Sequence, residues 1–516
     1  MRISNRSPDV TRKAISLKMR LKNYRLFADS GWFTIAPLTC LVGRNSSGKS
    51  SILSSILLLK QSVEQEGTGW GANPPPLVLS GRYCDLGNYS DLVHNHHESS
   101  EISFSFSVTF ADLERAYTQR GVPLVQLAAP RQRTYYGGGY FFGSTRGQEK
   151  LPKKGSIEVE MAFSAEEPFG PSIRRLEVIT TNMGTARFSR TPQGKNRRPT
   201  WGVHTDVLPP RSLRVETYRG SFFPIIQTHD ASFKKCGKPM RRKIQTFVAA
   251  VRMFWTFLQQ GLMRSEAVGP FRTPPERRYA FGGFGASRGG PSGEQTIDLL
   301  ITEMLLRPHG QRVRSLHNAL SFWIRHLQLA NSLDVKDIAR RLNLFQIQVT
   351  GAGRNFAPRG AAANLADVGF GISQILPVLM QGLLMRPGGV YLVQQPEIHL
   401  HPDAQAGLAD FFIYLASFGV ITIVETHSEY LLLRLRRRLA ENTPPISMGI
   451  SSEGPAPQPL KPSDVSVLFT GFEHKTALVK QLFIGSSFQF ENLPAGFMSQ
   501  ALDDRVALLK AVNKRK

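Results

Sequence analysis

The sequence predicts an α/β fold with an antiparallel β-lobe and a basic, partly helical insertion. Short apolar runs, such as residues 38–42 and 420–424, are typical of buried parallel strands and alternate with helix-like segments. Residues 101–108 alternate between polar and apolar side chains with period two, as a half-solvated antiparallel strand does. Residues 131–243 hold 22 basic and 9 acidic side chains, which sets this segment apart from the rest.

The first elements lead from paired strands to a helix. Residues 17–27 and 32–42 are apolar strands joined by a short turn of Ala, Asp, Ser and Gly. The apolar run at residues 51–59 predicts a helix soon after the second strand. From residue 111 to residue 243 the composition changes to Gly, Pro, Arg and aromatic residues, which predicts an insertion with mobile loops.

Helical periodicity returns at residues 242–263 and 298–329 and predicts a helical subdomain. A Gly-, Pro- and Arg-rich stretch at residues 269–293 separates the two helical segments. The elements that follow alternate as in an α/β fold, with strands at residues 344–349, 389–393 and 420–424 and a helix at residues 374–384.

Length and charge set broad limits on the molecule. A chain of 516 residues exceeds the size at which single domains usually stop growing, so we expect two lobes or a core with a large insertion. The formal net charge is +25, and a positive field of this size favours a polyanionic partner. Because the charge is unevenly distributed, nucleic acid, DNA or RNA, is favoured over simple colloidal solubility, with residues 131–243 as the expected surface.

Cysteine usage and hydropathy indicate the compartment. Cys40, Cys84 and Cys236 are widely spaced and match no zinc pattern, which favours a reducing, intracellular setting. The longest apolar runs are too short to cross a bilayer, and the N-terminal residues lack the apolar stretch of a signal peptide. We therefore expect a cytoplasmic protein with no membrane partner.

Residues 43–50 fill the pattern G-x-x-x-x-G-K-[ST], a loop whose backbone N–H groups wrap nucleotide phosphates. Lys49 can neutralise the β- and γ-phosphates, and the Ser50 hydroxyl can complete a Mg²⁺ shell. Strand, loop and helix occur in the order that the motif needs, so ATP or GTP is the expected ligand. The predicted nucleotide contacts in this loop are Gly43, Arg44, Asn45, Ser46, Ser47, Gly48, Lys49, Ser50 and Ser51.

Three further signals lie in the C-terminal half. Residues 364–374 include Gly371 and Ser373 beside a predicted helix, where small residues either bind an anion or simply cap the helix. Strand 389–393 ends at the place where a phosphate-loop ATPase has its Mg²⁺-binding and catalytic carboxylates. Strand 420–424 is followed by Glu425, Thr426, His427 and Ser428, and a histidine at such a strand end can reach a γ-phosphate.

Together these residues resemble the ABC-type ATPase superfamily, and within it the RecF/SMC/OLD-like AAA-family ATPases. The resemblance covers about residues 15–110 and 340–440 and leaves out the basic middle segment. The matching motifs are an opening Asn-Phe-Arg-like strand at 22–27, Walker A at 43–50, a signature loop at 367–374, Walker B and D-loop at 394–402, an H-loop at 425–428, and fainter matches at 268–272 and 492–497.

The resemblance implies an ABC-type P-loop ATPase head that uses ATP and Mg²⁺. It also implies a head-to-head homodimer, or a higher even-numbered oligomer, with ATP held between the Walker A motif of one subunit and the signature loop of the other. Gly371 and Ser373 would then contact the γ-phosphate across the interface. The implied segments are an N-terminal ATPase half (1–110), the basic insertion and helical subdomain (111–340), a C-terminal ATPase half (341–450) and a C-terminal segment (451–516).

The chain departs from the family at Walker B, where Gln394 and Gln395 replace acids. An amide oxygen is a weaker Mg²⁺ ligand than a carboxylate and cannot take a proton from water. We therefore expect slow ATP hydrolysis unless Glu397 or Glu425 takes the place of the missing acid. Gln394 is either the natural residue or a deliberate Glu-to-Gln change that traps the ATP-bound state, and the sequence leaves both alternatives open. The predicted catalytic residues are Gln394, Gln395, Glu397, Glu425 and His427, and the predicted metal ligands are Ser50 and Gln394.

Other clusters have structural explanations as alternatives. The histidines of residues 94–97 are expected in a solvated loop rather than at a metal, because no cysteine or carboxylate completes a site. The histidines of residues 399–401 fall in the D-loop of the resembled family. The arginines of residues 434–438 are expected on a solvated helix face, with a phosphate contact as the alternative.

The leading hypothesis is an ATPase that dimerises around ATP, senses nucleic acid and controls an effector such as a nuclease, similar to PtuA-like anti-phage defence ATPases. The sequence shows no match to the metal-binding acids of the Toprim domain of OLD-family nucleases, so any cutting is expected from a partner. The runner-up is an ABC transporter motor subunit, which the long basic insertion disfavours. The third hypothesis is a scaffold that binds ATP without hydrolysing it, because Gln394 replaces an acid at Walker B.

Overall fold

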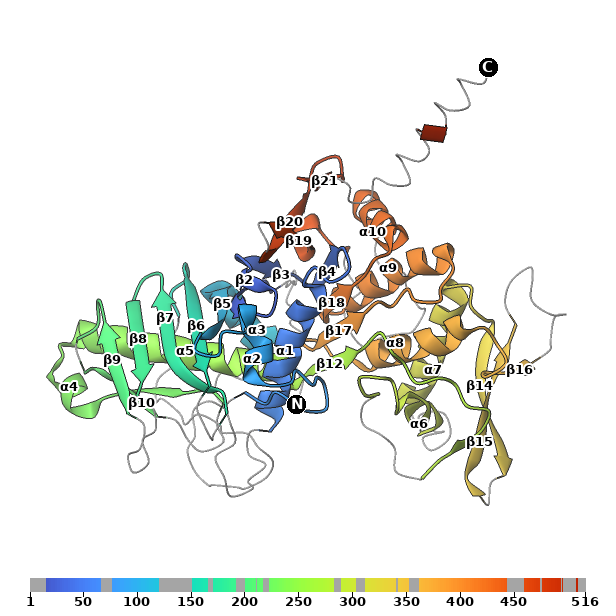
Figure 1. Ribbon diagram of the computed structural model, residues 1–516, viewed down its shortest axis with the longest axis horizontal. Helices are drawn as coiled ribbons and strands as arrows, with labels where there is room; N and C mark the ends of the chain where they lie inside the picture. The colour runs from blue at the N-terminus through green and yellow to red at the C-terminus, as the bar shows by residue number, and fades with distance from the viewer. Residues whose placement is uncertain are drawn as a thin grey trace, which may run out of the picture.

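The protein's architecture comes from a computed structural model, and the ribbon is shown in Figure 1. The aromatic and glycine-rich run at residues 135–142, which is part of the insertion predicted to have mobile loops, lies outside the described residues, as does most of the faint match at 492–497. The structure describes residues 15–65, 77–119, 151–165, 170–191, 200–209, 211–216, 222–282, 289–302, 311–339, 342–351, 362–442, 459–473, 476–492, 494 and 507–508.

A mostly parallel sheet forms the centre of the molecule, with strand order β12-β17-β18-β4-β19-β20-β21. The first five strands run parallel to their neighbours, and β20 and β21 return antiparallel. Since the carboxyl ends of parallel strands share one edge, the loops after β4, β17 and β18 meet there. The strands are β4 (Leu38–Gly43), β12 (Ser265–Val268), β17 (Val390–Gln394), β18 (Ile421–Glu425), β19 (Val465–Glu473), β20 (Thr476–Ile484) and β21 (Phe490–Glu491).

A second, antiparallel sheet extends to one side of the central sheet, with order β2-β1-β5-β6-β7-β8-β9 and β3 paired with β1. It runs from the N-terminal strands into the basic insertion, so the insertion continues an existing sheet. The strands are β1 (Leu17–Tyr24), β2 (Phe27–Asp29), β3 (Phe33–Ile35), β5 (Ile102–Thr109), β6 (Ser156–Ser164), β7 (Ser172–Thr180), β8 (Gly184–Arg190) and β9 (Trp201–Thr205).

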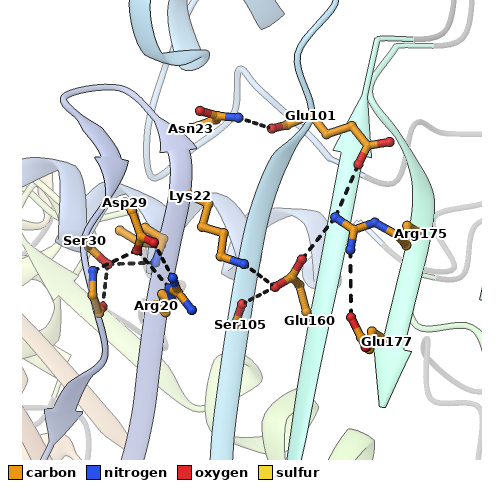
Figure 2. Close-up of polar contacts among 12 residues, drawn as sticks. Arg20, Lys22, Asn23, Asp29, Ser30, Glu101, Ser105, Glu160, Arg175 and Glu177 are labelled. Carbon is orange, nitrogen blue, oxygen red and sulfur yellow. Dashed lines mark hydrogen bonds and ion pairs between the residues drawn. The ribbon is translucent and has the colours of Figure 1, made fainter. Parts of the chain in front are cut away.

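One face of the antiparallel sheet carries paired charges, as Figure 2 shows. Lys22 lies 2.9 Å from Glu160, and the guanidinium of Arg175 lies 3.2 Å from the same carboxylate. Arg187 donates to Glu177 at 2.7 Å. Cross-strand pairs of opposite charge suit a solvated sheet face. Arg175 and Arg187 of the basic insertion are therefore paired with carboxylates of the same sheet.

The other face of the antiparallel sheet packs on the long helix α5, which lies along β6–β9 in Figure 1. Pro239 occupies the first turn of α5, where its missing N–H costs nothing. Apolar residues such as Phe247, Val251 and Phe254 recur at helical spacing and enter the core shared with α1. The described helices here are α1 (Lys49–Glu64), α2 (Tyr89–Leu92), α3 (Phe110–Gln119), α4 (Asp230–Lys235), α5 (Lys238–Met263) and the 3-10 turn η1 (His94–His96).

A second core lies on the opposite face of the central sheet, under α7 to α10. Alternate residues of each central strand serve the two cores: Leu41 packs with α1 and α5, whereas Cys40 and Val42 pack with α7 to α10. The elements around this core are α6 (Thr296–Ile301), α7 (Gln311–His326), α8 (Phe370–Leu384), α9 (Pro402–Ser417), α10 (Glu429–Glu441), η5 (Pro462–Asp464), β13 (Tyr279–Ala280), β14 (Ser332–Ala339), β15 (Leu344–Thr350) and β16 (Ala362–Asn364). Strands β10 (Leu213–Glu216) and β11 (Ile225–Thr228) form a separate two-stranded sheet.

The predicted fold class is confirmed, and three details were wrong. The single strand expected at residues 17–27 ends at residue 24, and a tight turn leads into β2, which pairs antiparallel with β1. The single strand expected at residues 32–42 is two strands, β3 and β4, separated at Ala36 and Pro37, because proline has no N–H to continue a ladder. Strand β5 was expected to be half-solvated, but Ser103 and Ser105 are buried beneath charged neighbours. Among the described helices, none combines the length and apolar content that crossing a bilayer requires.

The four predicted segments do not separate in space. The central sheet takes β4 from the first segment, β12 from the second, β17 and β18 from the third, and β19 to β21 from the fourth. The division remains a proposal about the order of the chain.

Candidate functional site

The phosphate-loop motif occupies the turn between β4 and α1. Two glycines are required there by geometry: Gly43 has φ of 141° and Gly48 has φ of 106°, in the region that side chains disfavour. A Cβ at Gly43 would meet the carbonyl oxygen of Thr470, and one at Gly48 would lie 2.7 Å from the ring of Phe27. The loop therefore curves as a phosphate-binding turn must, with α1 beginning at Lys49.

A cavity of about 680 Å³ opens over this loop. That volume lies within the range of small-molecule sites, which is roughly 300–1,000 Å³. Of the residues predicted from the sequence, residues 45–51 line the cavity together with Gln395, Glu425 and His427. Gly43 and Arg44, also predicted to contact the nucleotide, do not line it. The remaining lining residues come from the β1–β2 turn and from the segment that runs from α2 through η1: Arg25, Leu26, Asp91, Val93, His94, Asn95 and His96.

Glu425, at the end of β18, is the acid that reaches the phosphate loop. The hydroxyl of Ser50 donates to Glu425 Oε1 at 2.8 Å, and Glu425 Oε2 is buried with no hydrogen-bond partner in the described residues. Burial raises the pKa of Glu425, and the hydrogen bond from Ser50 opposes that shift. A buried carboxylate with an unsatisfied oxygen is a costly arrangement that a bound cation would relieve.

Lys49 is held inside the phosphate loop by backbone oxygens. Its Nζ donates to the carbonyls of Gly43 and Arg44 at 3.0 and 2.7 Å. Burial lowers the pKa of Lys49, because the loop shields its ammonium from water. The charge is thus held ready at the cavity wall, where phosphate oxygens can replace the two carbonyls.

Glu397 supports the neighbouring turn and does not line the cavity. Its Oε1 accepts from the backbone N–H of His427 at 2.6 Å, and its Oε2 is buried without a partner among the described residues. Burial raises the pKa of Glu397, against the hydrogen bond from the His427 N–H. Burial and the nearby Lys49 charge lower the pKa of His427, so its ring is neutral at pH 7. Glu397 thereby positions the turn that carries His427.

The two glutamines at the end of β17 are separated by the backbone turn. Gln395 has φ of 44° and lines the cavity, whereas Gln394, also predicted as a metal ligand, does not line it. Arg272, which we did not predict as a site residue, donates to the carbonyls of Gln394 and Gln395 at 2.9 and 3.1 Å and to that of Gln374 at 3.1 Å. Burial lowers the pKa of Arg272 to about 10. The guanidinium ties the end of β17 to α8.

The predicted signature loop lies at the start of α8, away from the cavity wall. Ser373 is buried, and its hydroxyl donates to the carbonyl of Phe370 at 2.9 Å. A Cβ on Gly371 would lie 2.8 Å from the carbonyl oxygen of His399, so the helix start packs closely on the β17–α9 turn. Gly369 and Phe370 are exposed at this end. A phosphate contact by Ser373 stays a prediction that requires its hydroxyl to leave this bond.

The arginines of α10 have structural roles. Arg434 and Arg438 both pair with the buried Asp410 of α9, and Arg436 donates to the carbonyl of Phe488 at 2.6 Å. These two arginines and His326, whose Nε2 lies 3.0 Å from Asp410 Oδ2, lower the pKa of Asp410 to about 2 against its burial. The solvated face predicted for these arginines is thus in part a packing surface.

A divalent cation fits the residues around Ser50 and Glu425. Within the described residues, no three His, Cys, Asp or Glu side chains gather closely enough to hold a metal by themselves. One hydroxyl and one carboxylate match the way Mg²⁺ is held in nucleotide sites, where phosphates and water supply the other ligands. The unsatisfied Oε2 of Glu425 is the observation that supports this fit.

Two segments of the chain match known family models. Residues 17–171 match a family model described as an AAA ATPase domain, and residues 294–434 match one described as "AAA domain, putative AbiEii toxin, Type IV TA system". No curated protein matches the chain. The chain therefore carries AAA-family ATPase sequence in both halves, and the site above joins the two.

Among solved structures, a Smc head bound to the C-winged helix domain of ScpA is 10% identical to this chain, with a TM-score of 0.40. The alignment covers 91% of this chain and 98% of the Smc head chain. The Smc head from Pyrococcus furiosus with an extended coiled coil is 10% identical, covers 97% and 100%, and has a TM-score of 0.38. The SMC head from Thermotoga maritima is 9% identical, covers 91% and 99%, and has a TM-score of 0.32. At these scores we rest no conclusion on them.

Proposed function

We propose that this chain, with AAA-family ATPase domains in its two matched segments, binds ATP with Mg²⁺ between the phosphate loop and Glu425. The observation that carries the proposal is the 2.8 Å contact of Ser50 with Glu425 Oε1 beside the unsatisfied Oε2. Mg²⁺, when bound, would neutralise charge on the β- and γ-phosphates. Glu425, at the end of the adjacent strand β18, thereby takes over the role that the resembled family gives to its Walker B acid on β17.

Lys49 and the α1 N-terminus would hold the phosphates. The Nζ of Lys49 can exchange its two carbonyl partners for phosphate oxygens without crossing the loop, because both carbonyls belong to the loop itself. The first N–H groups of α1 point out of the helix end and favour an anion there. ATP binding therefore needs little rearrangement of the turn between β4 and α1.

Hydrolysis is proposed to be slow. Gln395 lines the cavity but cannot take a proton from water, and Glu425 is occupied by Ser50 and the cation. The neutral ring of His427 can accept a hydrogen bond from water or donate one to phosphate, and it is the remaining polar group that we assign to the γ-phosphate end. An ATP-bound scaffold is the limiting case of this proposal, in which turnover is too slow to matter.

Calorimetric titration with ATP, with and without Mg²⁺, tests the site. In the wild type, Mg²⁺ should strengthen ATP binding, and Glu425→Gln should remove that gain while Mg²⁺-free binding persists. Glu397→Gln is the matched control, since it is also a buried glutamate but lies outside the cavity, and its amide oxygen can still accept from His427. Equal losses in both variants would contradict the assignment of Glu425, and no ATP binding in the wild type would refute the proposal.

We also propose that two subunits close around ATP through the start of α8. The exposed Gly369 and the 60% exposed Phe370 support this, because a large apolar side chain at a helix start is suited to a contact surface. Light scattering should show a dimer with ATP and a monomer for Lys49→Ala. Phe370→Ser should bind ATP and stay monomeric. A wild type that keeps monomer mass at saturating ATP would contradict this part.

Nucleic-acid binding is proposed at the corner between α4 and α5, at one end of the molecule in Figure 1. From residue 231 to residue 265 the sequence has eight Lys or Arg and no Asp or Glu. Lys234, Lys235, Lys238 and Arg242 are exposed there, and none pairs with a carboxylate in the described part of the chain. This contrasts with the paired cations of Figure 2. Unpaired, clustered cations are what phosphate backbones bind.

Salt-dependent binding to duplex and single-stranded oligonucleotides tests that corner. Replacing Lys234, Lys238 and Arg242 with glutamine should lower the slope of log K against log salt by about 2.7 for duplex DNA. Replacing the paired Arg20, Arg175 and Arg187 with glutamine changes the net charge equally and should leave the slope nearly unchanged. If the control lowers the slope as much, net charge and not this corner explains binding.

Effector control completes the proposal. A separate effector, such as a nuclease, and a role in cytoplasmic anti-phage defence follow from the resemblance of the motifs to PtuA-like ATPases. Co-purification with the products of adjoining genes, followed by phage challenge of cells with and without Lys49→Ala, tests this part. A protective effect that survives Lys49→Ala would separate defence from nucleotide binding.

A further inference from the structure

The nucleotide cavity has a second wall that the phosphate motifs do not explain. It is formed by the β1–β2 turn and by the segment around η1, with His94 and His96 among the lining residues. A nucleotide whose phosphates occupy the loop must place its ribose and base against other parts of the same cavity. This wall is therefore the available surface for the non-phosphate part of the ligand.

The segment is fixed in place from both sides. The N–H of Arg25 donates to the carbonyl of Leu92 at 2.6 Å, and Tyr24 and Val93 form a β-bridge. At the start of α2, Asp91 Oδ2 accepts from the N–H of Asn88 at 2.8 Å. A binding wall fixed before the ligand arrives loses little entropy on binding.

The backbone of the segment is strained. Asn95 and His96 have φ of 59° and 58°, so two successive residues with side chains adopt the left-handed conformation. Asparagine and histidine tolerate this conformation better than most residues, but two in succession still carry some strain, which persists where the surrounding contacts impose it. The strain presents consecutive side chains, including that of His96, to one cavity.

Both histidines have their tautomer fixed by carbonyl oxygens. Nδ1 of His94 lies 2.8 Å from the carbonyl oxygen of Arg25, and Nδ1 of His96 lies 3.0 Å from that of Ser90. Because a carbonyl oxygen can only accept, each Nδ1 carries the hydrogen, and each Nε2 of the neutral ring is a bare acceptor. Neither Nε2 has a hydrogen-bond partner among the residues that the structure describes.

We propose that His94 and His96 recognise the adenine base by accepting hydrogen bonds from its exocyclic amino group. The amino group has two hydrogens to donate, and the two histidines that line the wall each have one acceptor nitrogen left by the Nδ1 hydrogen bond. The inference rests on the proposed nucleotide function and adds the base-reading residues to it. The ribose hydroxyls are also donors, and the test below separates them from the amino group.

The test compares ATP with purine riboside triphosphate, which carries hydrogen in place of the amino group, by calorimetric competition in the wild type and in one double variant. The variant combines His94→Asn and His96→Asn, since asparagine keeps a donor at the Nδ1 position and removes Nε2. His97→Asn is the control, because His97 is adjacent but does not line the cavity.

The wild type and His97→Asn should bind ATP about tenfold more tightly than purine riboside triphosphate, the size of one to two good hydrogen bonds. The double variant should bind both nucleotides equally, with purine riboside triphosphate bound as tightly as by the wild type, which also shows that the variant is folded. Equal binding of the two nucleotides by the wild type would overturn the inference and leave the phosphate site standing.

Two further outcomes are informative. A loss specific to 2′-deoxy-ATP in the wild type, without a preference for the amino group, would assign the acceptors to the ribose and overturn base recognition. Failure of the wild type to bind either triphosphate would refute the proposed function itself, and this inference with it.

Discussion

Strands β17 and β18 lie side by side and end at the same cavity with opposite chemistry. β17 ends in Gln394 and Gln395, and β18 ends in Glu425, which stands opposite Gln394 in the sheet register. The backbone of the β17 end is held by Arg272, whereas the side chain at the β18 end is held by Ser50. One strand end is fixed through its backbone and the other acts through its side chain.

The difference teaches that a carboxylate on the adjacent strand can reach the phosphate loop, as the proposed Mg²⁺ site requires. Neighbouring strands are about 4.8 Å apart, which is within the reach of a glutamate side chain. A motif search along the sequence places the acid at position 394, but the sheet brings position 425 to the same edge. Loss of the family's acid at β17 therefore does not remove the negative charge from the loop.

The largest expected effect comes from Glu425→Gln. Removing the carboxylate that Ser50 contacts should weaken Mg²⁺-dependent ATP binding by about 100-fold, a cost typical of perturbed metal sites. Titration calorimetry at saturating Mg²⁺ measures the loss. If Gln394→Ala weakens Mg²⁺-dependent ATP binding more than Glu425→Gln does, the metal ligand lies on β17 and the assignment to β18 is wrong.

The next largest effect is expected at the end of β17, where Arg272 holds the backbone. Arg272→Met should lower the free energy of unfolding by about 2 kcal/mol, because carbonyls of Gln374, Gln394 and Gln395 lose their buried donor. Denaturant unfolding measures the change, and Arg272→Lys should restore part of it. If the free energy of unfolding is unchanged in Arg272→Met, the hydrogen bonds from Arg272 do not stabilise the end of β17.

A transposed carboxylate sharpens the comparison further. The double variant Gln394→Glu with Glu425→Gln should recover about tenfold of the binding lost in Glu425→Gln, since the two positions are paired across the sheet. The single variant Gln394→Glu should raise ATP turnover, measured by phosphate release. No recovery in the double variant would show that the positions are not interchangeable.

The smallest expected effect is a pH dependence of folding stability that arises from Glu425 at the end of β18. Burial raises the pKa of Glu425 in the folded protein, so ionisation is less costly in the unfolded chain. Stability of the nucleotide-free protein should therefore fall as the pH rises from the ordinary glutamate pKa to the raised one, and then level off. Glu425→Gln should weaken this trend in thermal unfolding. Gln394→Ala should keep the trend and widen it slightly, because the Gln394 amide opposes the upward shift of the Glu425 pKa.

Much of the site was predictable because its motifs are local. The phosphate loop, the helix after it and the strand ends at Gln394 and Glu425 follow from runs of a few residues whose geometry depends on near neighbours. The ordering of strand, loop and helix was enough to place Lys49 and Ser50. The buried apolar runs likewise predicted β4, β17 and β18 correctly.

The rest depended on contacts between distant positions. The role of Arg272 could not be predicted, because its partners are backbone carbonyls about a hundred positions away. The histidines near residue 95 were expected in a solvated loop, and they line the nucleotide cavity because the segment pairs with the turn after β1. Charge counts alone did not distinguish paired cations from unpaired ones.

By itself the sequence determined the phosphate loop, its strands and its helix, since period and turn chemistry fix local backbone geometry. Only the tertiary structure decided which acid serves that loop. Ser50 and Glu425 are 375 positions apart, and parallel strand order in the central sheet is what brings them into contact. Strand order is set by the packing of two cores against the sheet, which no local pattern encodes.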